Sequence, residues 1–379
     1  DLRLWYKCKQ ISIIMVKIKD ITQYLEQFAP LDYQESYDNC GLITGNPEWE
    51  VTGILISLDC TEAIVSEAIK EKCNLIIAHH PIWFRPLKKL SGQTYVERTI
   101  VQSIKHDVAI YAIHTNLDNV QQGVNAKLAE RLGLQNPQVL APKHATLMKL
   151  VTFCPTDHTS KVLAALHAAG AGSVGNYQEC AFISTGTGTF KPNQQADPYI
   201  GKSDELERVD EERIEVLLEK THQKAILKAL NHAHPYEEVA YYFQELANIN
   251  QNIGSGMIGH LDNEVSQKDF LQHTKSSLGT ACLKHSVLTD RAVKKVAICG
   301  GAGSFLINHA IKSGCDAFLT SDLKYHEFFD ADGKLLIVDI GHYESEVATK
   351  DLLGDLLNEN FSKFAVRLSK IDTNPIRYF

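Results

Sequence analysis

Residues 53–78 read GILISLDCTEAIVSEAIKEKCNLIIA and contain two apolar runs separated by an amphipathic segment. The runs Gly53–Asp59 and Asn74–Ala78 are short and apolar, which predicts two buried strands. Between them, Thr61–Lys72 repeats its apolar residues at helical spacing, which predicts a helix. Strand, helix and strand in this order form a β-α-β unit, whose two strands are parallel.

The same alternation continues beyond this unit. The sequence predicts a helix at 94–105, a strand at Val108–Ile113, and a helix at Val124–Leu132 that ends at Gly133. Near the end of the chain, strands and helices are expected to alternate again at 295–299, 304–313, 317–320, 325–329, 334–340 and 344–358. Alternation of this kind implies a largely parallel sheet covered by helices, so we expect the two ends of the chain to be halves of one α/β core domain.

The pattern changes between residues 145 and 250. Strand, helix, strand, strand, helix and strand are expected there, in turn at 147–154, 160–169, 181–189, 213–218, 223–231 and 239–246. This β-α-β-β-α-β order predicts a ferredoxin-like insert, in which the acidic stretch 191–212 is a long exposed hairpin connection. We therefore divide the chain into a first core half at 15–144, an insert at 145–250 and a second core half at 251–379.

The N-terminal residues stand apart from this organisation. We expect residues 1–14 to be an upstream extension, non-native or disordered, that carries no function. Met15 follows, and Asp20 or Thr22 is expected to cap a helix over residues 21–28. The apolar run Ile11–Val16 is far shorter than the ~20 residues that cross a bilayer and lacks a small-residue cleavage site, so we expect neither a signal peptide nor a membrane anchor.

Composition narrows the class of protein. Of 379 residues, 44% are hydrophobic and 22% are charged, which is typical of a globular protein and excludes large-scale disorder. The net charge of −8 disfavours a broad basic surface, so nucleic acid is not an expected partner. The nine cysteines are odd in number, scattered and never spaced C-x-x-C, which argues against a disulfide framework or a cysteine-ligated zinc site and favours a reducing cytoplasm.

Polar side chains follow three of the predicted parallel strands. His79 and His80 come directly after N-L-I-I-A, and the segment H-T-N-L-D, residues 114–118, comes after V-A-I-Y-A-I. The segment G-H-Y-E-S-E, residues 341–346, begins after K-L-L-I-V-D-I. In open α/β sheets the carboxyl ends of the strands form the binding edge, so three strands deliver histidine or carboxylate side chains to one rim.

The spacing of these residues favours two metal ions. His342 and Glu346 share one face of a helix, whereas adjacent His79 and His80 in extended chain point in divergent directions and can serve two neighbouring ions. Imidazole and carboxylate ligands suit Zn²⁺, Fe²⁺, Mn²⁺ or Co²⁺, and a carboxylate can bridge ions about 3.5–4 Å apart. We expect two divalent ions per chain on His79, His80, Asp118, His342 and Glu346. The alternative is that each histidine only makes structural hydrogen bonds, but independent histidines need not converge at three strand ends.

Two neighbouring features leave their alternatives open. His114 ends its strand, where it either orients a metal ligand or is a hydrogen-bonded core histidine. In the loop G-G-A-G-S, Gly300, Gly301 and Gly303 precede a helix and could bind a phosphate or carboxylate through main-chain N–H groups. Tight packing of strand against helix explains the same glycines.

Further polar residues follow another strand end. In S-D-L-K-Y-H, Asp322, Tyr325 and His326 could line the same cleft, and Tyr325 and His326 are candidate catalytic residues for proton transfer or substrate contact. A helix cap formed by Ser321 or Asp322 is the alternative. In D-N-C-G-L, residues 38–42, we favour a turn over a ligand contact.

Four motifs of this chain resemble the GTP cyclohydrolase 1 type 2 family, also described as the interacting-factor-3 family with a dinuclear metal centre. They are N-L-I-I-A-H-H-P at 74–81, H-T-N-L-D at 114–118, V-A-I-C-G-G-A-G-S at 296–304 and G-H-Y-E-S-E at 341–346. The resemblance extends from Met15 to about Asp372. The middle section, with H-P-Y-E-E-V-A-Y at 234–241, is similar to the P-II/CutA-like insert of longer bacterial members.

The resemblance implies the same five metal ligands. It further implies that His80 and Asp118 hold one ion, that His79 and His342 hold the other, and that Glu346 bridges the two. A toroidal homo-hexamer with its metals facing an internal cavity is also implied. The chain has Ser321 in place of the commoner glycine of G-D-x-K-Y-H, which affects a peripheral contact and leaves the metal set intact.

Two functions are consistent with this sequence. One is a metal-dependent hydrolase that acts on a nucleotide or another small substrate, with GTP cyclohydrolase-like ring opening as one such reaction. If GTP is the substrate, the glycine loop and lysines such as Lys324 are the available triphosphate contacts. The other is a non-catalytic metal-containing regulatory or scaffold protein whose insert senses a ligand or sets assembly.

Overall fold

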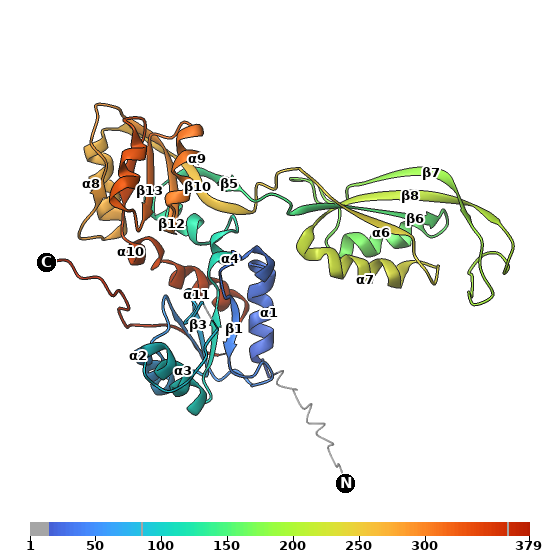
Figure 1. The fold of residues 1–379 in the computed structure, drawn as a ribbon, viewed down its shortest axis with the longest axis horizontal. Helices are drawn as coiled ribbons and strands as arrows, with labels where there is room; N and C mark the ends of the chain where they lie inside the picture. Colours follow the sequence, from blue (N-terminus) through green and yellow to red (C-terminus); the bar gives the residue numbers. More distant parts are fainter. Residues whose placement is uncertain (1–14, 85, 362–363) are drawn as a thin grey trace, which may run out of the picture. The chain divides into compact units, whose positions relative to one another are not determined.

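The computed structural model describes residues 15–84, 86–361 and 364–379, so the expected extension at 1–14 lies outside the described residues. The chain forms two compact units (Figure 1). The first combines the two ends of the chain, up to Ala141 and from Gly254 onward, and the second is Pro142–Ile253. The insert expected at 145–250 falls within the second unit.

The first unit contains two sheets rather than the single sheet expected from the sequence. One has the strand order β1-β4-β3-β2-β15, in which β4, β3, β2 and β15 are parallel and β1 is antiparallel to β4. Its strands are β1 Gly41–Thr44, β2 Ile54–Ser57, β3 Leu75–Ala78, β4 Ala109–Ala112 and β15 Val366–Leu368. The quoted β-α-β unit therefore forms the centre of this sheet, with α2 Glu62–Lys70 as its helix.

The other sheet of this unit has the order β11-β14-β13-β12-β10-β5. Strands β12, β13 and β14 are parallel, and β10 and β11 are antiparallel to their neighbours β12 and β14. Its strands are β5 Gln135–Pro142, β10 Gly254–Val265, β11 Lys284–His285, β12 Val293–Ala302, β13 Ala317–Ser321 and β14 Leu336–Asp339. Each half of the chain supplies most of one sheet, but β15 from the second half pairs with β2, and β5 from the first half lies at the edge of the other sheet. Strand β10, which the sequence patterns did not reveal, pairs with β12.

Several helices of the first unit differ from the expected ones only at their ends, but the helix Gln267–Leu278 was not expected, and the one expected at 344–358 is two helices. The α-helices are α1 Ile18–Phe28, α3 Tyr95–Lys105, α4 Thr115–Asp118, α5 Val124–Leu132, α8 Gln267–Leu278, α9 Ile307–Lys312, α10 His342–Glu346 and α11 Thr349–Asn360. Short 3-10 helices lie at η1 Leu31–Tyr33, η3 Ser304–Leu306 and η4 Tyr325–Ala331. As expected, α5 ends where Gly133 takes a left-handed conformation, with φ of 69°.

The start of α1 was predicted wrongly. The helix begins at Ile18, so Asp20 lies in its first turn and caps it from inside, where Oδ2 accepts a hydrogen bond from the Lys17 N–H at 2.7 Å. None of the helices in the described part of the chain is long and apolar enough to span a membrane.

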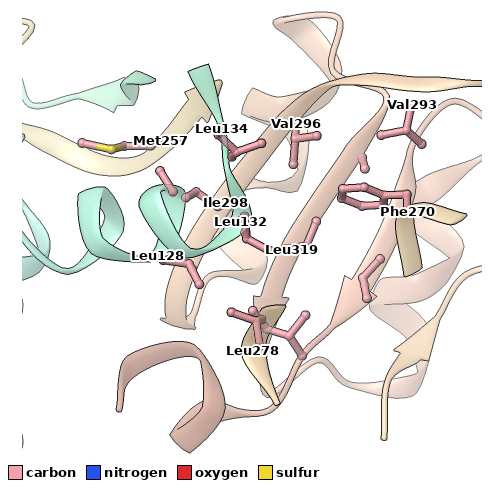
Figure 2. Close-up of a cluster of buried hydrophobic side chains, with 14 of the residues drawn as sticks. Leu128, Leu132, Leu134, Met257, Phe270, Leu278, Val293, Val296, Ile298 and Leu319 are labelled. Atoms are coloured by element: carbon pink, nitrogen blue, oxygen red, sulfur yellow. The ribbon is translucent and has the colours of Figure 1, made fainter. Parts of the chain in front are cut away.

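A buried apolar cluster fixes the second sheet of this unit (Figure 2). Leu128 and Leu132 from α5, with Phe270 from α8, pack against Val296 and Ile298 of β12. Because these side chains lie in one layer between helices and sheet, they hold the strand ends that carry the site described below.

Ile298→Val removes one methylene from this cluster, where Ile298 is fully buried. It is expected to lower the free energy of unfolding by about 0.5–1.5 kcal/mol. Ile104→Val is the matched control, because Ile104 is 52% exposed on α3, and it should change stability by less than about 0.5 kcal/mol. Urea unfolding followed by circular dichroism measures both, and equal losses would contradict the assignment of Ile298 to the core.

The second unit is a four-stranded antiparallel sheet with two helices. Its elements are β6 Leu147–Pro155, α6 Thr159–Ala168, β7 Ala181–Phe190, β8 Glu207–Glu219, η2 Lys220–His222, α7 Gln223–Ala233 and β9 Tyr241–Glu245. The strand order is β7-β8-β6-β9, and apolar residues of both helices pack on one face. Strand β8 begins at Glu207 instead of Arg213, because the charged residues before Arg213 continue the hairpin with β7.

Candidate metal centre

The five residues expected to bind metal lie together in the first unit. His79 and His80 follow β3, Asp118 ends α4 just after β4, and His342 and Glu346 are the first and last residues of α10. The carboxyl ends of parallel strands position all of them, as strand-end reasoning predicts, but β3 and β4 belong to one sheet and β14 belongs to the other, so they do not share the single rim that was expected. A cavity of 440 Å³ adjoins the cluster and is lined in part by His80, Asp118, His342 and Glu346.

Glu346 divides these residues into two groups. In one, His79 Nε2 lies 3.6 Å from Asp118 Oδ1 and 3.8 Å from Glu346 Oε1. In the other, Glu346 Oε2 lies 2.9 Å from His80 Nε2 and 3.1 Å from His342 Nε2. The ligand atoms within each group lie within 4.8 Å of one another, which is close enough for one ion. The two oxygens of Glu346 therefore face different groups, as a bridging carboxylate requires.

This grouping differs from the pairing that the family resemblance implied. The structure places His79 with Asp118, and His80 with His342. The pairing of His80 with Asp118 and of His79 with His342 therefore stays a prediction, and the grouping of ligand atoms in the structure does not favour it. The direction of each side chain decides which residues form a group, and the order of the residues along the chain does not reveal that direction.

The double variant His79→Ala/Asp118→Asn tests the grouping. Both residues belong to one group, so the variant is expected to lose about one ion per chain and keep the other. His79→Ala/His342→Ala is the matched comparison, which removes one ligand from each group and should weaken both ions. Elemental analysis after gel filtration measures the content, and loss of both ions from the first variant alone would contradict the grouping.

The Nδ1 atom of each histidine contacts a protein acceptor. His80 Nδ1 lies 2.8 Å from Asp59 Oδ1, and His342 Nδ1 lies 2.7 Å from Asp322 Oδ2. His79 Nδ1 lies 2.8 Å from the Ile113 carbonyl oxygen. Since carboxylates and carbonyls only accept, each Nδ1 carries a hydrogen, and each Nε2 faces the cluster, where it can bind a metal once it has lost its own proton.

Asp59→Asn is expected to weaken metal binding by about 10–100-fold, because the carboxylate that orients His80 loses its charge. Asp330→Asn, an exposed position on η4, is the matched control and should bind as the parent chain does. Competition with a chelator of known affinity measures both. Unchanged affinity in Asp59→Asn would show that this hydrogen bond does not support a metal ligand.

The cluster contains buried polar atoms without a protein partner, which is the test of whether a metal fits. Among the described residues, His79 Nε2 and Asp118 Oδ1 are buried and make no hydrogen bond. An unpaired buried polar atom costs about 1–3 kcal/mol, so such atoms signal a missing group. The two orphaned atoms face each other in one group, and nitrogen with oxygen is the donor set of divalent transition metals. The residues therefore fit a metal ion.

Electrostatics within the cluster favour positive charge. Burial would lower the pKa of His80, but its hydrogen bonds to Asp59 and Glu346 raise it to about 10. Burial also opposes protonation of His342, whose pKa rises to about 9 because of Glu346 and Asp322. Burial raises the pKa of Asp118 to about 7, with a further contribution from the charge of Glu346. The cluster thus attracts protons, and divalent cations would displace them.

Comparison with known proteins finds relatives that match almost the whole chain. The sequence profile of the Duf34/NIF3 family (NGG1p interacting factor 3) matches residues 16–375. The chain belongs to the Duf34/NIF3 family. A GTP cyclohydrolase 1 type 2 homolog from Bacillus subtilis (strain 168) is 40% identical over 365 residues, which are 95% of this chain and 98% of the relative. A protein of the same description from Halalkalibacterium halodurans is 38% identical, with 94% and 98% covered.

Solved structures extend the comparison to the fold. A Bacillus cereus protein related to NIF3 matches with a TM-score of 0.84 at 39% identity, covering 96% of this chain and 100% of that one. A Staphylococcus aureus protein matches with a TM-score of 0.77 at 31% identity, covering 96% and 99%. The mixed α/β architecture with several sheets is therefore that of the Duf34/NIF3 family.

In this Duf34/NIF3 protein, His114 lies beside the candidate metal ligands, forms a further possible group of ligand atoms with His79 and His80, and is held by Asp38. His114 Nδ1 is 2.9 Å from Asp38 Oδ1, and its ring contacts the rings of His79 and His80. Asp38 also accepts hydrogen bonds from Thr115. Burial would raise the pKa of Asp38, but the contact with His114 and these hydrogen bonds lower it well below its usual range. Asp38, for which a turn was favoured over a ligand contact, therefore fixes a histidine at the edge of the candidate centre.

The glycine loop supports the centre by close packing. The N–H of Gly300 donates to Asn125 at 2.9 Å, and the N–H of Gly301 donates to Ser345 at 3.0 Å, so both already have partners. A Cβ at Gly301 would lie 2.4 Å from Glu346 Oε1, and its φ is 63°. The packing explanation for these glycines accounts for the geometry, whereas an anion would compete with both side chains.

The predicted catalytic residues lie elsewhere on the first unit. Tyr325 is 75% exposed on η4, and His326, beside it, is also exposed. Neither lines the cavity, and their rings contact each other and Phe329. Asp322 instead orients His342, in a left-handed backbone conformation with φ of 56°. The structure therefore does not bring Tyr325 and His326 to the metal cluster.

Sequence reasoning missed two parts of the site. Asp59, which follows β2, orients His80, and reading past that strand end would have found it. Near the C-terminus, Asn374, Pro375 and Ile376 line the cavity, and Thr373 donates a hydrogen bond of 2.5 Å to Asp59. That segment carries no periodic pattern, so no sequence signal connects it with the site.

Proposed function

We propose that this chain is a dinuclear divalent-metal protein that hydrolyses a nucleotide or another small substrate. The observation that carries the proposal is the position of Glu346, whose two oxygens face two separate groups of ligand atoms. Zn²⁺, Fe²⁺, Mn²⁺ and Co²⁺ suit this mixed nitrogen and oxygen donor set. Such ions, when bound, lower the pKa of water toward neutrality, which is the chemistry that hydrolysis needs.

The surrounding residues support a small substrate. The cavity of 440 Å³ falls within the range of small-molecule sites, about 300–1,000 Å³. Aromatic side chains of Tyr37, Phe84 and Phe305 contribute to its wall and can stack on a planar group. The name of the Bacillus subtilis relative, a GTP cyclohydrolase 1 type 2 homolog, makes GTP the first nucleotide to test.

Several finer assignments belong to the same proposal. We infer that the second unit is a ferredoxin-like insert of the P-II/CutA type, because its element order and antiparallel strand order suit that topology. On the basis of the sequence we also propose a homo-hexamer and a cytoplasmic location. We further propose that a substrate site includes Tyr325, His326 and the glycine loop. A neighbouring copy in an oligomer would be needed to bring the exposed Tyr325 and His326 to a substrate.

The first experiment measures metal content and turnover together. Protein purified without a metal-affinity step is analysed for metal, stripped with a chelator, and reloaded with Zn²⁺, Mn²⁺, Fe²⁺ or Co²⁺. GTP and a panel of phosphoesters are then assayed in the stripped and reloaded states. About two ions per chain with metal-dependent turnover is the expected result. Failure to take up metal would overturn the dinuclear centre.

The same experiment separates the hydrolase from a regulatory protein. Two bound ions without turnover of any nucleotide or phosphoester would overturn the hydrolase and leave a metal-containing regulatory or scaffold protein. Reloaded Glu346→Gln is the control for contaminating hydrolases, because any activity that persists in this variant does not come from the centre.

A further inference from the structure

The second unit contains a cavity of its own, separate from the metal centre. It has a volume of 680 Å³, which is within the range of small-molecule sites. Its walls are the end of β7, the connection that follows β7, part of β8, and the segment between α7 and β9. The connection is tied down at Asp197, whose N–H donates to Glu237 Oε1 at 2.9 Å.

Aromatic rings form much of the wall of this cavity. Tyr236 contacts both Phe190 and Tyr199, with ring centroids 6.0 and 6.3 Å apart. Phe153 and Tyr242 form another ring pair of the lining, 6.1 Å apart. Ring faces carry the negative part of the aromatic quadrupole, so walls of this kind attract cations.

A carboxylate lies among these rings. Glu211 is only 9% exposed, and its Oε1 accepts a hydrogen bond from the Tyr236 hydroxyl at 2.9 Å. A Cβ at Gly188 would lie 2.0 Å from Glu211 Oε2, so glycine at this position makes room for the carboxylate. A carboxylate offers about four acceptor sites, and the tyrosine hydroxyl uses one of them.

The remaining charges of the lining leave the cavity negative. Arg213 is paired with Glu215 at 2.6 Å, a carboxylate that also pairs with Lys149. Glu237 and Glu238 add carboxylates to the lining beside Glu211, against the exposed Lys191. A phosphate or carboxylate ligand would have to approach the buried Glu211, which disfavours anions.

We propose that this cavity binds a small organic cation, a molecule with an ammonium group placed against the cluster of rings formed by Tyr236, Phe190 and Tyr199 and near Glu211. The ammonium group would supply the charge that the buried carboxylate lacks, and the rings would replace its water shell. The site lies within the second unit, so the proposal stands whether or not the metal centre is a hydrolase.

Three cations serve as probes: choline, benzyltrimethylammonium and spermidine. Binding to the full-length protein is measured by saturation-transfer NMR and titration. The uncharged isostere of choline, 3,3-dimethyl-1-butanol, has nearly the same shape and is expected to bind at least about tenfold more weakly. Equal binding of choline and its isostere, or no saturation transfer to any of the three cations, would overturn the proposal.

Two matched variants place the cation within the unit. Glu211→Gln keeps the size of the side chain but removes its charge, and it should weaken binding of the tightest probe by at least about tenfold. Glu212→Gln changes the next residue of β8, which does not line the cavity, and should leave binding unchanged. If Glu211→Gln does not fold, Tyr236→Phe, which removes only the hydroxyl that holds Glu211, is measured instead and should weaken binding.

A third variant separates this site from the metal centre. Glu346→Gln lies in the first unit and should bind the cation as the parent chain does. Loss of cation binding in Glu346→Gln, or equal losses in Glu211→Gln and Glu212→Gln, would contradict the location of the site.

Discussion

Glu346→Gln is expected to reduce bound metal from about two ions per chain to nearly none. Glu346 is 2% exposed, and its oxygens face both groups of ligand atoms. Glutamine keeps the shape of the side chain but removes the charge that offsets buried histidines, and its amide nitrogen cannot bind a metal. Because the residue is shared, one substitution should affect both positions, unlike loss of His79 or His342.

The control for this variant is Glu344→Gln on the same short helix. Glu344 is only half-buried and contacts Asn374 at 3.3 Å, away from the ligand atoms. The Glu344→Gln variant should bind as much metal as the parent chain, as measured by elemental analysis. Circular dichroism establishes that Glu346→Gln is folded, and a folded variant that still holds two ions would refute Glu346 as the bridge.

Much of the candidate metal site could be predicted from the sequence because strand ends are easy to recognise. The run Leu75–Ala78 is fully buried, so its end, and with it His79 and His80, is sharply marked. The spacing of His342 and Glu346 places them on one turn of α10, where their side chains meet at 3.1 Å. Local patterns therefore specify which residues reach the rim.

Contacts between distant segments could not be predicted in this way. Asp322 was recognised as a strand-end residue, but its partner, His342, lies on another element, and only the fold brings them to 2.7 Å. The grouping of ligands around Glu346 likewise depends on side-chain direction. The 3-10 helix that carries Tyr325 and His326 presents them to solvent, although the strand before it points toward the site.

The sheets show the same limit of local patterns. The edge strand β11 consists of Lys284 and His285, which no apolar periodicity can reveal, and it exists only because β14 provides partners. In the second unit, the charged residues of β8 before Arg213 resemble a loop, yet they pair with β7 across an exposed hairpin. These segments are strands because they form hydrogen bonds with a neighbouring strand, and not because their side chains are buried.

Gly301→Ala is expected to disrupt the centre although it changes no ligand. The new Cβ would lie 2.4 Å from Glu346 Oε1, so the carboxylate that we propose as the bridge must move from its position beside His79. A displacement of this size exceeds the tolerance of a metal site. Metal binding should therefore weaken more than it does when an orienting contact is lost, which costs about 10–100-fold in affinity. Chelator competition and metal content measure the effect.

Gly279→Ala separates this effect from backbone strain. Gly279 has φ of 67°, close to the 63° of Gly301, but a Cβ there would meet nothing within 4 Å. Both variants should therefore lose about 1–2 kcal/mol of stability from the left-handed conformation, and only Gly301→Ala should lose metal. Equal metal binding in the Gly301→Ala and Gly279→Ala variants would mean that Glu346 can shift and still bridge the ions. Gly301 would then be needed only for the left-handed backbone conformation of the turn.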